Sequence, residues 1–434
     1  MSAWRLASAA ALLALLTWPV AGRAAERCVA LEGGRVWLPS GPVEGATVVI
    51  VGERVAAAAA GAAVPEGCER VDVSGRVVTP GFVEVQSQLG LIEVEMESST
   101  DDAHAGTQET PNPSVRASFS VADAYNPRST VIPVTRLGGV TSALSVPDGG
   151  LIAGRSAFVD LAGGSQAEAV VRRDVAMHAS VGGGGDSRAW TLGRLRALLT
   201  EARDFQTHEA AWRQNRTPPL AFPPAELVAL RPVLAGTMPL VLDVDRASDI
   251  EAALRLASDF GLRLVVSGGA EAWMVADALA RAKVPVIVDA MLNAPERFDR
   301  IRARADNASL LWAAGVPLLL TTASTHNART LGQVAGNAVR AGLPVEAAMR
   351  ALTETPARVF GIADRGRLAA GARANVVVWS GDPFEVSSAP ERIFIGGRDI
   401  PRVSRQTLLR DRYRRLERLH APLGLPTGAA ASPR

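Results

Sequence analysis

Two glutamines, Gln86 and Gln88, stand at the end of an apolar stretch that is entered through Pro80 and Gly81. The stretch is typical of a buried strand, and on a strand two residues spaced i, i+2 point to the same face. Histidines at both positions could bind a metal ion, whereas neutral amides are weak ligands for zinc. We therefore expect the two amides to form hydrogen bonds with a small polar ligand.

Further polar side chains follow later apolar stretches, at points where strands are expected to end. If those strands are parallel and form a barrel, their carboxyl ends meet at one face, where barrel enzymes place their active sites. Asp243 and His326 could form an acid/base pair that works without a metal, although a lone histidine after a strand is more often structural. The other candidate ligand-binding residues are Asp245, Ser267, Thr322 and Ser324.

The supply of metal ligands and general bases is small. The sequence has five histidines, of which no two lie within a few residues of each other, and Lys283 is its single lysine. The polar segment 91–118 contains Asp101, Asp102 and His104. We interpret it as a solvated loop, with a functional loop as the alternative.

A run of four glycines at 182–185 precedes a helical stretch that begins near Trp190. Asp186 or Ser187 could cap that helix. The run lacks the Gly-Lys-Ser/Thr ending of a phosphate-binding P-loop. We therefore expect a flexible loop at the mouth of the barrel.

The composition is that of a globular protein. Of 434 residues 48% are hydrophobic and 21% are charged, and the net charge of +2 argues against nucleic acid as the main partner. The length predicts one large domain and one smaller domain.

The N-terminus has the pattern of a signal peptide spanning residues 1–25, with Arg5 before an apolar core and small residues at the cleavage site. A membrane anchor is the alternative, but the core is short for a membrane span. The pattern predicts a periplasmic or secreted protein. In that setting Cys28 and Cys68, the only cysteines, are expected to form a disulfide; two buried free thiols are the alternative.

Short alternating strands occur near both ends of the chain, and units of a buried strand followed by an amphipathic helix fill the region between them. The pattern predicts a (β/α)₈ TIM-like barrel beside a small β-sandwich domain built from both chain ends. A doubly wound open sheet is the alternative, but no dinucleotide-binding fingerprint follows any strand. The expected divisions are the signal peptide at 1–25, β-domain at 26–80 and 366–400, barrel at 81–365, and helical tail at 401–434.

The segment GRVVTPGFVEVQSQLG resembles the first barrel strand of the amidohydrolase superfamily, in particular its imidazolonepropionase-like members. The resemblance extends from about Val29 to Ile400 and includes RASDI after the fifth strand and the closing segment that ends in VVVWSGDP. In the family form an Asp precedes His-x-His, whereas this chain has Glu84, Gln86 and Gln88.

The other metal-binding positions that the resemblance implies are also changed. Asp243 stands where a histidine is expected on the fifth strand, and Ala323 stands in place of the aspartate on the eighth. No histidine follows the sixth strand, and Lys283 lies at the wrong end of the barrel to supply a carbamate. The metal site is therefore expected to be degenerate, because an activated water requires a Lewis acid with about three firm ligands.

Two classes of function follow. The first is a non-catalytic or repurposed homologue without a cofactor, a pseudoenzyme that binds a small polar molecule. The alternative is an active hydrolase of non-peptide C–N bonds with a metal-free site or one weakly bound divalent metal. Expected partners are the small molecule and either a second copy of the chain or an active relative. Neither nucleic acid nor a membrane span after signal removal is expected.

Overall fold

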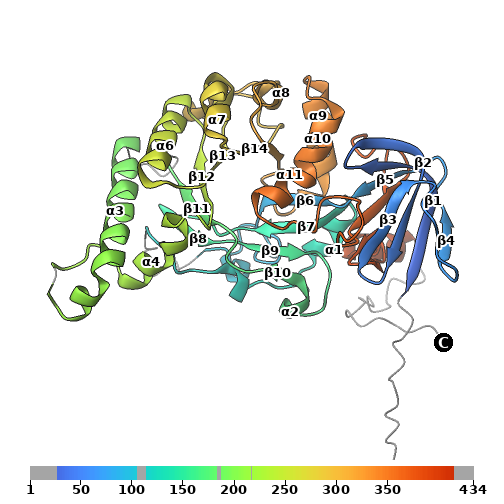
Figure 1. Ribbon diagram of the computed structural model, residues 1–434, viewed down its shortest axis with the longest axis horizontal. Helices are drawn as coiled ribbons and strands as arrows, with labels where there is room; N and C mark the ends of the chain where they lie inside the picture. Colours follow the sequence, from blue (N-terminus) through green and yellow to red (C-terminus); the bar gives the residue numbers. More distant parts are fainter. Residues whose placement is uncertain (1–26, 105–113, 183–186, 217, 415–434) are drawn as a thin grey trace, which may run out of the picture.

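The computed structural model describes residues 27–104, 114–182, 187–216 and 218–414 (Figure 1). The predicted signal peptide, Asp186 and most of the glycine run lie outside the described residues. Within the described part of the chain, no helix combines the length and the apolar character needed to cross a bilayer.

Strands from both ends of the chain form one sheet, in the order β18-β17-β16-β5-β1-β2-β3, with β4 beside β1. The two ends meet where β5 pairs antiparallel with β16, with Val78 opposite Val378. The strands of this sheet are β1 (Cys28–Leu38), β2 (Gly41–Val51), β3 (Arg54–Ala60), β4 (Glu69–Asp72), β5 (Val77–Pro80), β16 (Val376–Trp379), β17 (Pro390–Ile395) and β18 (Arg398–Asp399).

This sheet curls around its own core. Val55 near one edge and Phe394 near the other belong to the same buried cluster, and an isolated bridge joins Arg54 to Arg373. The strands thus form one continuous curled sheet, where the sequence led us to expect a sandwich. The predicted disulfide between Cys28 and Cys68 is confirmed, and it ties the start of β1 to the segment before β4.

Two further sheets form the centre of the molecule. Their strand orders are β10-β9-β7-β6 and β15-β14-β13-β12-β11-β8. The pairs β6–β7 and β11–β12 through β14–β15 are parallel, as expected for buried strands that alternate with helices. The strands are β6 (Phe82–Ser87), β7 (Val140–Ser145), β8 (Ile152–Arg155), β9 (Ala157–Asp160), β10 (Val170–Arg172), β11 (Met177–Ser180), β12 (Leu240–Val244), β13 (Leu264–Gly268), β14 (Val286–Val288) and β15 (Leu318–Leu320).

The segment that follows the second central strand, β7, departs from a regular (β/α)₈ pattern. Strands β8 and β9 are separated only by Ser156, and they run antiparallel to β11 and β7 respectively. Only residues 146–151 separate β7 from β8. A parallel crossover needs a dozen or more residues, so a connection this short reverses the chain.

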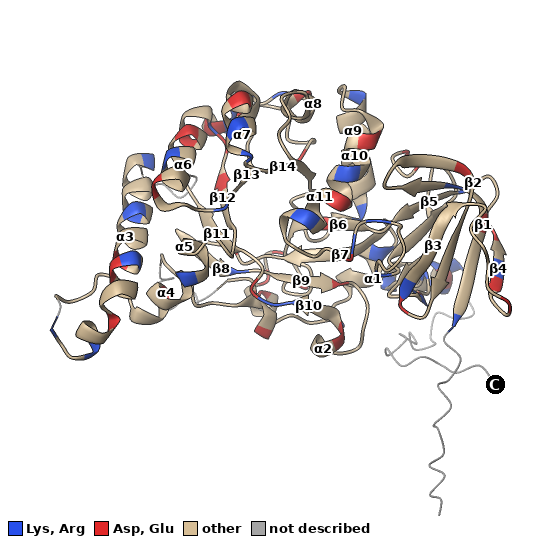
Figure 2. Cartoon of the chain, in the orientation of Figure 1, with Lys and Arg blue, Asp and Glu red and all other residues tan. Residues whose placement is uncertain are grey.

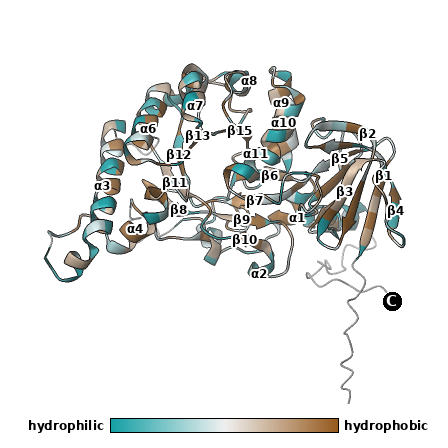
Figure 3. Cartoon of the chain, viewed as in Figure 1, coloured by the Kyte–Doolittle hydropathy of each residue, from teal (hydrophilic) through white to brown (hydrophobic). Residues whose placement is uncertain are grey.

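Helices cover the outer side of the parallel strands (Figure 1). The strands are coloured mainly as hydrophobic, whereas helices such as α6 show both colours (Figure 3). The helices are α1 (Val131–Arg136), α2 (Gln166–Ala169), α3 (Arg188–Arg213), α4 (Pro224–Ala229), α5 (Arg231–Leu234), α6 (Ala247–Phe260), α7 (Ala276–Ala282), α8 (Asn307–Ala313), α9 (Leu331–Arg340), α10 (Val345–Leu352), α11 (Glu354–Val359) and α12 (Arg405–Arg414).

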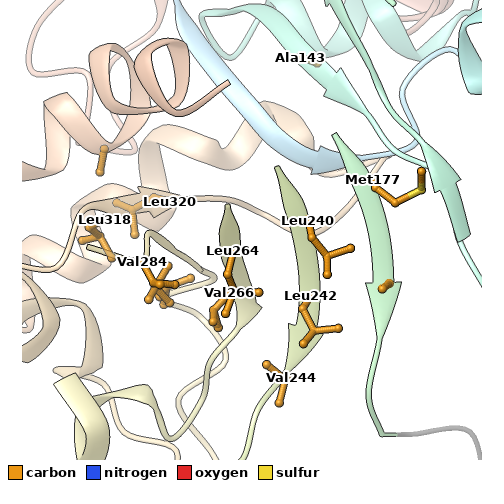
Figure 4. Packing of buried hydrophobic residues seen from close by; sticks show 14 of the residues in the cluster. Ala143, Met177, Leu240, Leu242, Val244, Leu264, Val266, Val284, Leu318 and Leu320 are labelled. Atoms are coloured by element: carbon orange, nitrogen blue, oxygen red, sulfur yellow. The ribbon is translucent and has the colours of Figure 1, made fainter. Parts of the chain in front are cut away.

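The two faces of the parallel strands belong to different buried clusters. Leu240, Leu242 and Leu264 belong to the large cluster that includes helix side chains (Figure 4). Val241 and Val265, at the alternate positions, belong to a separate cluster shared with residues of β6, β7, β14 and β15. Alternation therefore assigns residues 241, 243 and 245 to the inner face of β12.

Candidate functional site

A cavity of about 520 Å³ lies at the carboxyl ends of the central strands. Three of the predicted site residues line it: Gln86 on β6, Asp243 on β12 and Ser267 on β13. Asp243 pairs with Ser180 on one side and with Ser267 on the other, which places these strand ends next to each other. The remaining lining residues are Ser114, Pro147, Asp148, Gly149, Gly150, Leu151, Ala153, His178, Ala179, Ser180, Gly182, Thr191 and Val241.

His178 on β11 is a site residue that the sequence analysis did not single out. It pairs with Val241 and is 5% exposed, and its Nε2 has no hydrogen-bond partner among the described residues. Burial lowers the pKa of His178 to about 3, so the imidazole is neutral at physiological pH. The neighbouring residues Met177 and Ala179 are apolar, so nothing in the local sequence distinguished His178 from a core position.

The carboxylate of Asp243 faces the cavity without a donor. Among the described residues, no side chain and no backbone N–H donates a hydrogen bond to it. Asp243 is exposed to the open cavity, yet the protein around its carboxyl group reduces hydration, and this effect, followed by the nearby charge of Asp245, raises the pKa of Asp243 to about 6, while Arg300 and Arg297 act in the opposite direction. The carboxyl group therefore titrates near neutral pH.

Asp245, predicted as a ligand-binding residue, is paired with two arginines and does not line the cavity. Its side chain is buried, and Oδ2 accepts hydrogen bonds from Arg297 Nη2 at 2.9 Å and Arg300 Nε at 2.6 Å. A Cβ atom on Gly268 would lie 2.7 Å from Asp245 Oδ1 and 3.1 Å from Asp243 Oδ1, and Gly268 has a left-handed φ of +86°. Glycine is therefore required where the two aspartates converge.

The rim of the cavity includes a chain of charged groups from the polar segment. His104 Nδ1 lies 2.7 Å from Asp101 Oδ2, and His104 Nε2 lies 3.5 Å from Oδ2 of the lining residue Asp148. The contact with Asp148, more than that with Asp101, raises the pKa of His104, and the same contact lowers the pKa of Asp148. These side chains are thus engaged at the rim, where the sequence led us to expect a solvated loop.

Besides Asp245, four predicted site residues are not among those that line the cavity. Gln88 Oε1 accepts a hydrogen bond from Thr325 Oγ1 at 3.0 Å, and the Thr325 hydroxyl also accepts one from Gln88 N at 3.0 Å. Thr322 donates to Glu84, and Ser324 accepts from the backbone N–H of Asn327. None of these three, nor His326, is among the residues that line the cavity.

The acid/base pair of Asp243 and His326 is not formed. His326 Nδ1 lies 2.8 Å from Glu95 Oε1, and Nε2 lies 3.1 Å from the carbonyl oxygen of Glu93. Both ring nitrogens are therefore occupied by the segment after β6. The histidine that shares the cavity with Asp243 is His178.

The side chains at the strand ends do not match the ligand set of a zinc site. Within the described ranges, no group of three His, Cys, Asp or Glu side chains is placed to hold a metal ion. The end of β6 supplies the amide of Gln86, and the loop after β15 supplies Ala323 where the resemblance implies an aspartate. Zinc is held by at least three His, Cys or carboxylate ligands, which this set lacks.

Comparison with known proteins gives consistent relationships. Residues 249–408 match the amidohydrolase family Amidohydro_3. The solved structure of an amidohydrolase from Thermotoga maritima MSB8 superposes with a TM-score of 0.77 at 25% identity, covering 86% of this chain and all of that one. Ochratoxinase from A. niger, with a TM-score of 0.52 and 15% identity over 87% of this chain and 96% of its own, shares the fold.

Two curated relatives are similar in sequence. Amidohydrolase tasK of Hapsidospora irregularis is 24% identical in an alignment of 421 positions that covers 87% of this chain and 41% of tasK. N-acyl-D-glutamate deacylase of Alcaligenes xylosoxydans xylosoxydans is 45% identical in an alignment of 65 positions that covers 13% of each protein. This chain therefore spans about two fifths of tasK and a far smaller part of the deacylase. The family match over residues 249–408, the curated relatives and the shared fold all relate the chain to amidohydrolases.

Proposed function

We propose that this protein is a repurposed amidohydrolase homologue that binds a small polar molecule in the cavity at its strand ends. One observation carries the proposal: Gln86 and His178 both line the cavity, and each has a buried polar atom, Oε1 and Nε2, without a hydrogen-bond partner in the described part of the chain. A buried polar atom without a partner costs about 1–3 kcal/mol. A bound polar molecule would remove that cost.

The composition of the cavity supports binding over zinc-dependent hydrolysis. Its strand ends offer one amide, one neutral imidazole and one carboxylate, in place of the ligand set that the superfamily resemblance implies. Within the superfamily, we place the chain among imidazolonepropionase-like members with a degenerate metal site. The sequence frame around Glu84 supports this placement, and the comparisons reach only the superfamily.

Hydrolysis of a C–N bond is the second candidate, and the raised pKa of Asp243 favours it. A carboxylate with a pKa of about 6 can act as a general base at neutral pH. In this reaction Asp243 takes a proton from water while the oxygen attacks the carbonyl carbon. The C–N bond then breaks and the proton passes to the leaving amine. His326 has no part in this scheme, since its ring nitrogens are occupied.

A fragment-binding experiment with paired variants tests the proposal. A library of small polar fragments is titrated against the wild type and against Gln86→Leu, His178→Leu and Gln88→Leu, with thermal shift and then calorimetry as readouts. Fragments should lose at least tenfold in affinity in the first two variants. Gln88→Leu is the matched control because Gln88 faces Thr325, and it should bind within twofold of the wild type.

Equal binding by all four proteins, or no binding by the wild type, would contradict the proposal. Release of amine from a panel of cyclic and acylated amides, abolished in Asp243→Asn, would instead favour the hydrolase.

We further propose that the protein acts outside the cytoplasm, on the basis of the N-terminal pattern of residues 1–25 and the Cys28–Cys68 disulfide. Pairing with a second copy or with an active relative stays a proposal as well. Cell fractionation with mass determination of the mature protein tests the first idea, and light scattering tests self-association.

A further inference from the structure

We propose that the ligand of this cavity is a small organic cation, of the amidinium, guanidinium or ammonium type, whose N–H groups are bound by Asp243 and Gln86. This inference rests on the proposed function and names the chemical class of the ligand. It follows from the charge, the hydrogen-bonding groups and the size of the cavity.

The charged side chains that line the cavity are of one sign. Asp148 and Asp243 line it, and no lysine or arginine is among the lining residues that the structure describes, although the chain contains 46 basic residues. In Figure 2 the basic residues lie mainly on helices and loops. His104 and Arg116 lie beside Asp148 at the rim and offset its charge, so the negative charge that a ligand meets is mainly that of Asp243. A concave site with such a carboxylate attracts positive charge and repels anions.

The two arginines whose charges act on Asp243 are already engaged by other carboxylates. Arg297 and Arg300 both donate to Oδ2 of Asp245, and Arg297 also lies 3.2 Å from Asp299. Their positive charge is thus largely matched by Asp245 and Asp299. The carboxylate of Asp243 receives no hydrogen bond from any described residue, so it is available to a ligand.

The unpaired atoms of the cavity are mainly acceptors. The carboxylate of Asp243 and Gln86 Oε1 can only accept hydrogen bonds, and the neutral ring of His178 can accept one at Nε2. A ligand that carries several N–H donors on a planar cation would satisfy all three. A ligand carboxylate would meet acceptors and negative charge.

The size and the walls of the cavity suit a single-ring molecule. A volume of about 520 Å³ is in the usual range for small-molecule sites, and Pro147, Leu151 and Val241 supply apolar wall area beside the polar groups. An aromatic amidine could place its ring against these residues and its charged end against Asp243.

Three probes of nearly equal shape test the inference. Benzamidine is cationic, benzamide is neutral and benzoate is anionic, so calorimetry at pH 7.5 separates charge from shape. We expect benzamidine to bind at least tenfold more tightly than benzamide, and benzoate not to bind measurably. In Asp243→Asn, benzamidine should lose at least tenfold in affinity while benzamide changes by less than twofold.

Asp289→Asn is the matched control. Burial also raises the pKa of Asp289 to about 6, and this carboxyl follows β14 but is not among the residues that line the cavity. Benzamidine should bind the Asp289→Asn variant as it binds the wild type. A denaturation curve for each variant establishes that it is folded.

The outcomes separate this inference from the proposed function. If benzamide or benzoate binds as tightly as benzamidine, or if uncharged fragments bind in a Gln86-dependent way while benzamidine does not, the cationic ligand is wrong and the binding function stands. If no fragment of any charge binds, both are wrong. Equal loss of benzamidine affinity in the Asp243 and Asp289 variants would also overturn the assignment to Asp243.

Discussion

The hydroxyl of Thr322 donates a 2.7 Å hydrogen bond to Oε2 of Glu84, which joins the end of β15 to the first central strand, β6. Thr322 N donates to the same oxygen at 3.0 Å, and Oε1 accepts from the backbone N–H groups of Val85 at 2.8 Å and Gln86 at 3.0 Å. Glu84 is fully buried, and this burial raises its pKa despite the donors. The carboxylate thus fixes the backbone that carries Gln86 into the cavity.

Glu84→Gln should lower the free energy of unfolding by about 1–3 kcal/mol, because the new amide NH₂ would face N–H and O–H donors. Urea denaturation at pH 7 measures the change. Glu95→Gln, an exposed glutamate next to His326, is the control and should differ from the wild type by less than about 0.5 kcal/mol. An unchanged stability in Glu84→Gln would show that the donors around Glu84 are satisfied in another way.

The buried His178 should make the protein sensitive to acid. Its pKa is lowered from 6.5 to about 3, so between these values the unfolded state binds a proton that the folded state does not. Stability from this group is therefore present above pH 6.5 and is lost as the pH falls toward 3. Between pH 7 and pH 5 the loss amounts to about 2 kcal/mol.

Replacement of His178 by Gln should remove this part of the pH dependence. Urea denaturation at pH 7 and pH 5 measures the change in the free energy of unfolding between the two pH values. The raised pKa values of Asp243 and Asp289 affect stability in the opposite direction, but they do so equally in the wild type and in His178→Gln. His208→Gln, at an exposed position on α3, is the control. A pH dependence that is the same in His178→Gln and the wild type would be contrary to this prediction.

Asp160 and Arg365 form a buried ion pair, with Arg365 Nη2 2.8 Å from Asp160 Oδ2. The same carboxylate accepts hydrogen bonds from Ser142 Oγ at 2.8 Å and Asn375 Nδ2 at 3.0 Å. Arg365→Met should destabilise the protein by about 3–5 kcal/mol, because the buried carboxylate loses its hydrogen-bonded cation and keeps only Arg373, whose Nε lies 3.9 Å from Asp160 Oδ2. The double variant Asp160→Asn/Arg365→Met should lose less than the sum of the single variants. Additive losses in this double-mutant cycle would mean that the pair does not interact energetically.

The purified protein is expected to carry no stoichiometric zinc, because the strand ends offer too few anionic or imidazole ligands. Elemental analysis after exhaustive dialysis, with zinc or manganese supplied during expression, measures the content. One tightly held ion per chain that is lost in Asp243→Ala would reverse the conclusion and make a metal-dependent hydrolase the leading function. A weakly bound hard cation, removed by dialysis, would be compatible with the acidic lining of the cavity.

The sequence predicted well those features that depend on local pattern. Apolar stretches ending in polar residues gave the positions of Asp243 and Ser267, and both line the cavity. The Ser187 side chain caps α3 by accepting from Trp190 N at 3.2 Å, one of the two capping residues expected. The pairing of the two cysteines followed from their even number in a chain with an export signal.

Features that depend on contacts between distant segments were not accessible from pattern. His326 is held by Glu93 and Glu95, which belong to the segment after β6 and lie 233 and 231 residues earlier in the chain. Strands β8 and β9 run antiparallel to their neighbours because the connection after β7 is short. Their apolar composition does not reveal this direction, since it is equally suited to parallel strands. His178 lies in a short buried strand, where a single histidine resembles a core residue.

The pairing of β5 with β16 has a consequence for biosynthesis. Strand β5 pairs with β16, where Val78 lies opposite Val378. The edge of β5 that faces β16 therefore has no neighbouring strand until nearly the whole polypeptide has been made. Long-range strand pairing of this kind slows folding, and an unpaired strand edge is prone to association with other chains. Synthesis from the N-terminus therefore completes the first sheet last, and the edge of β5 stays open to association with other chains until β16 has been made.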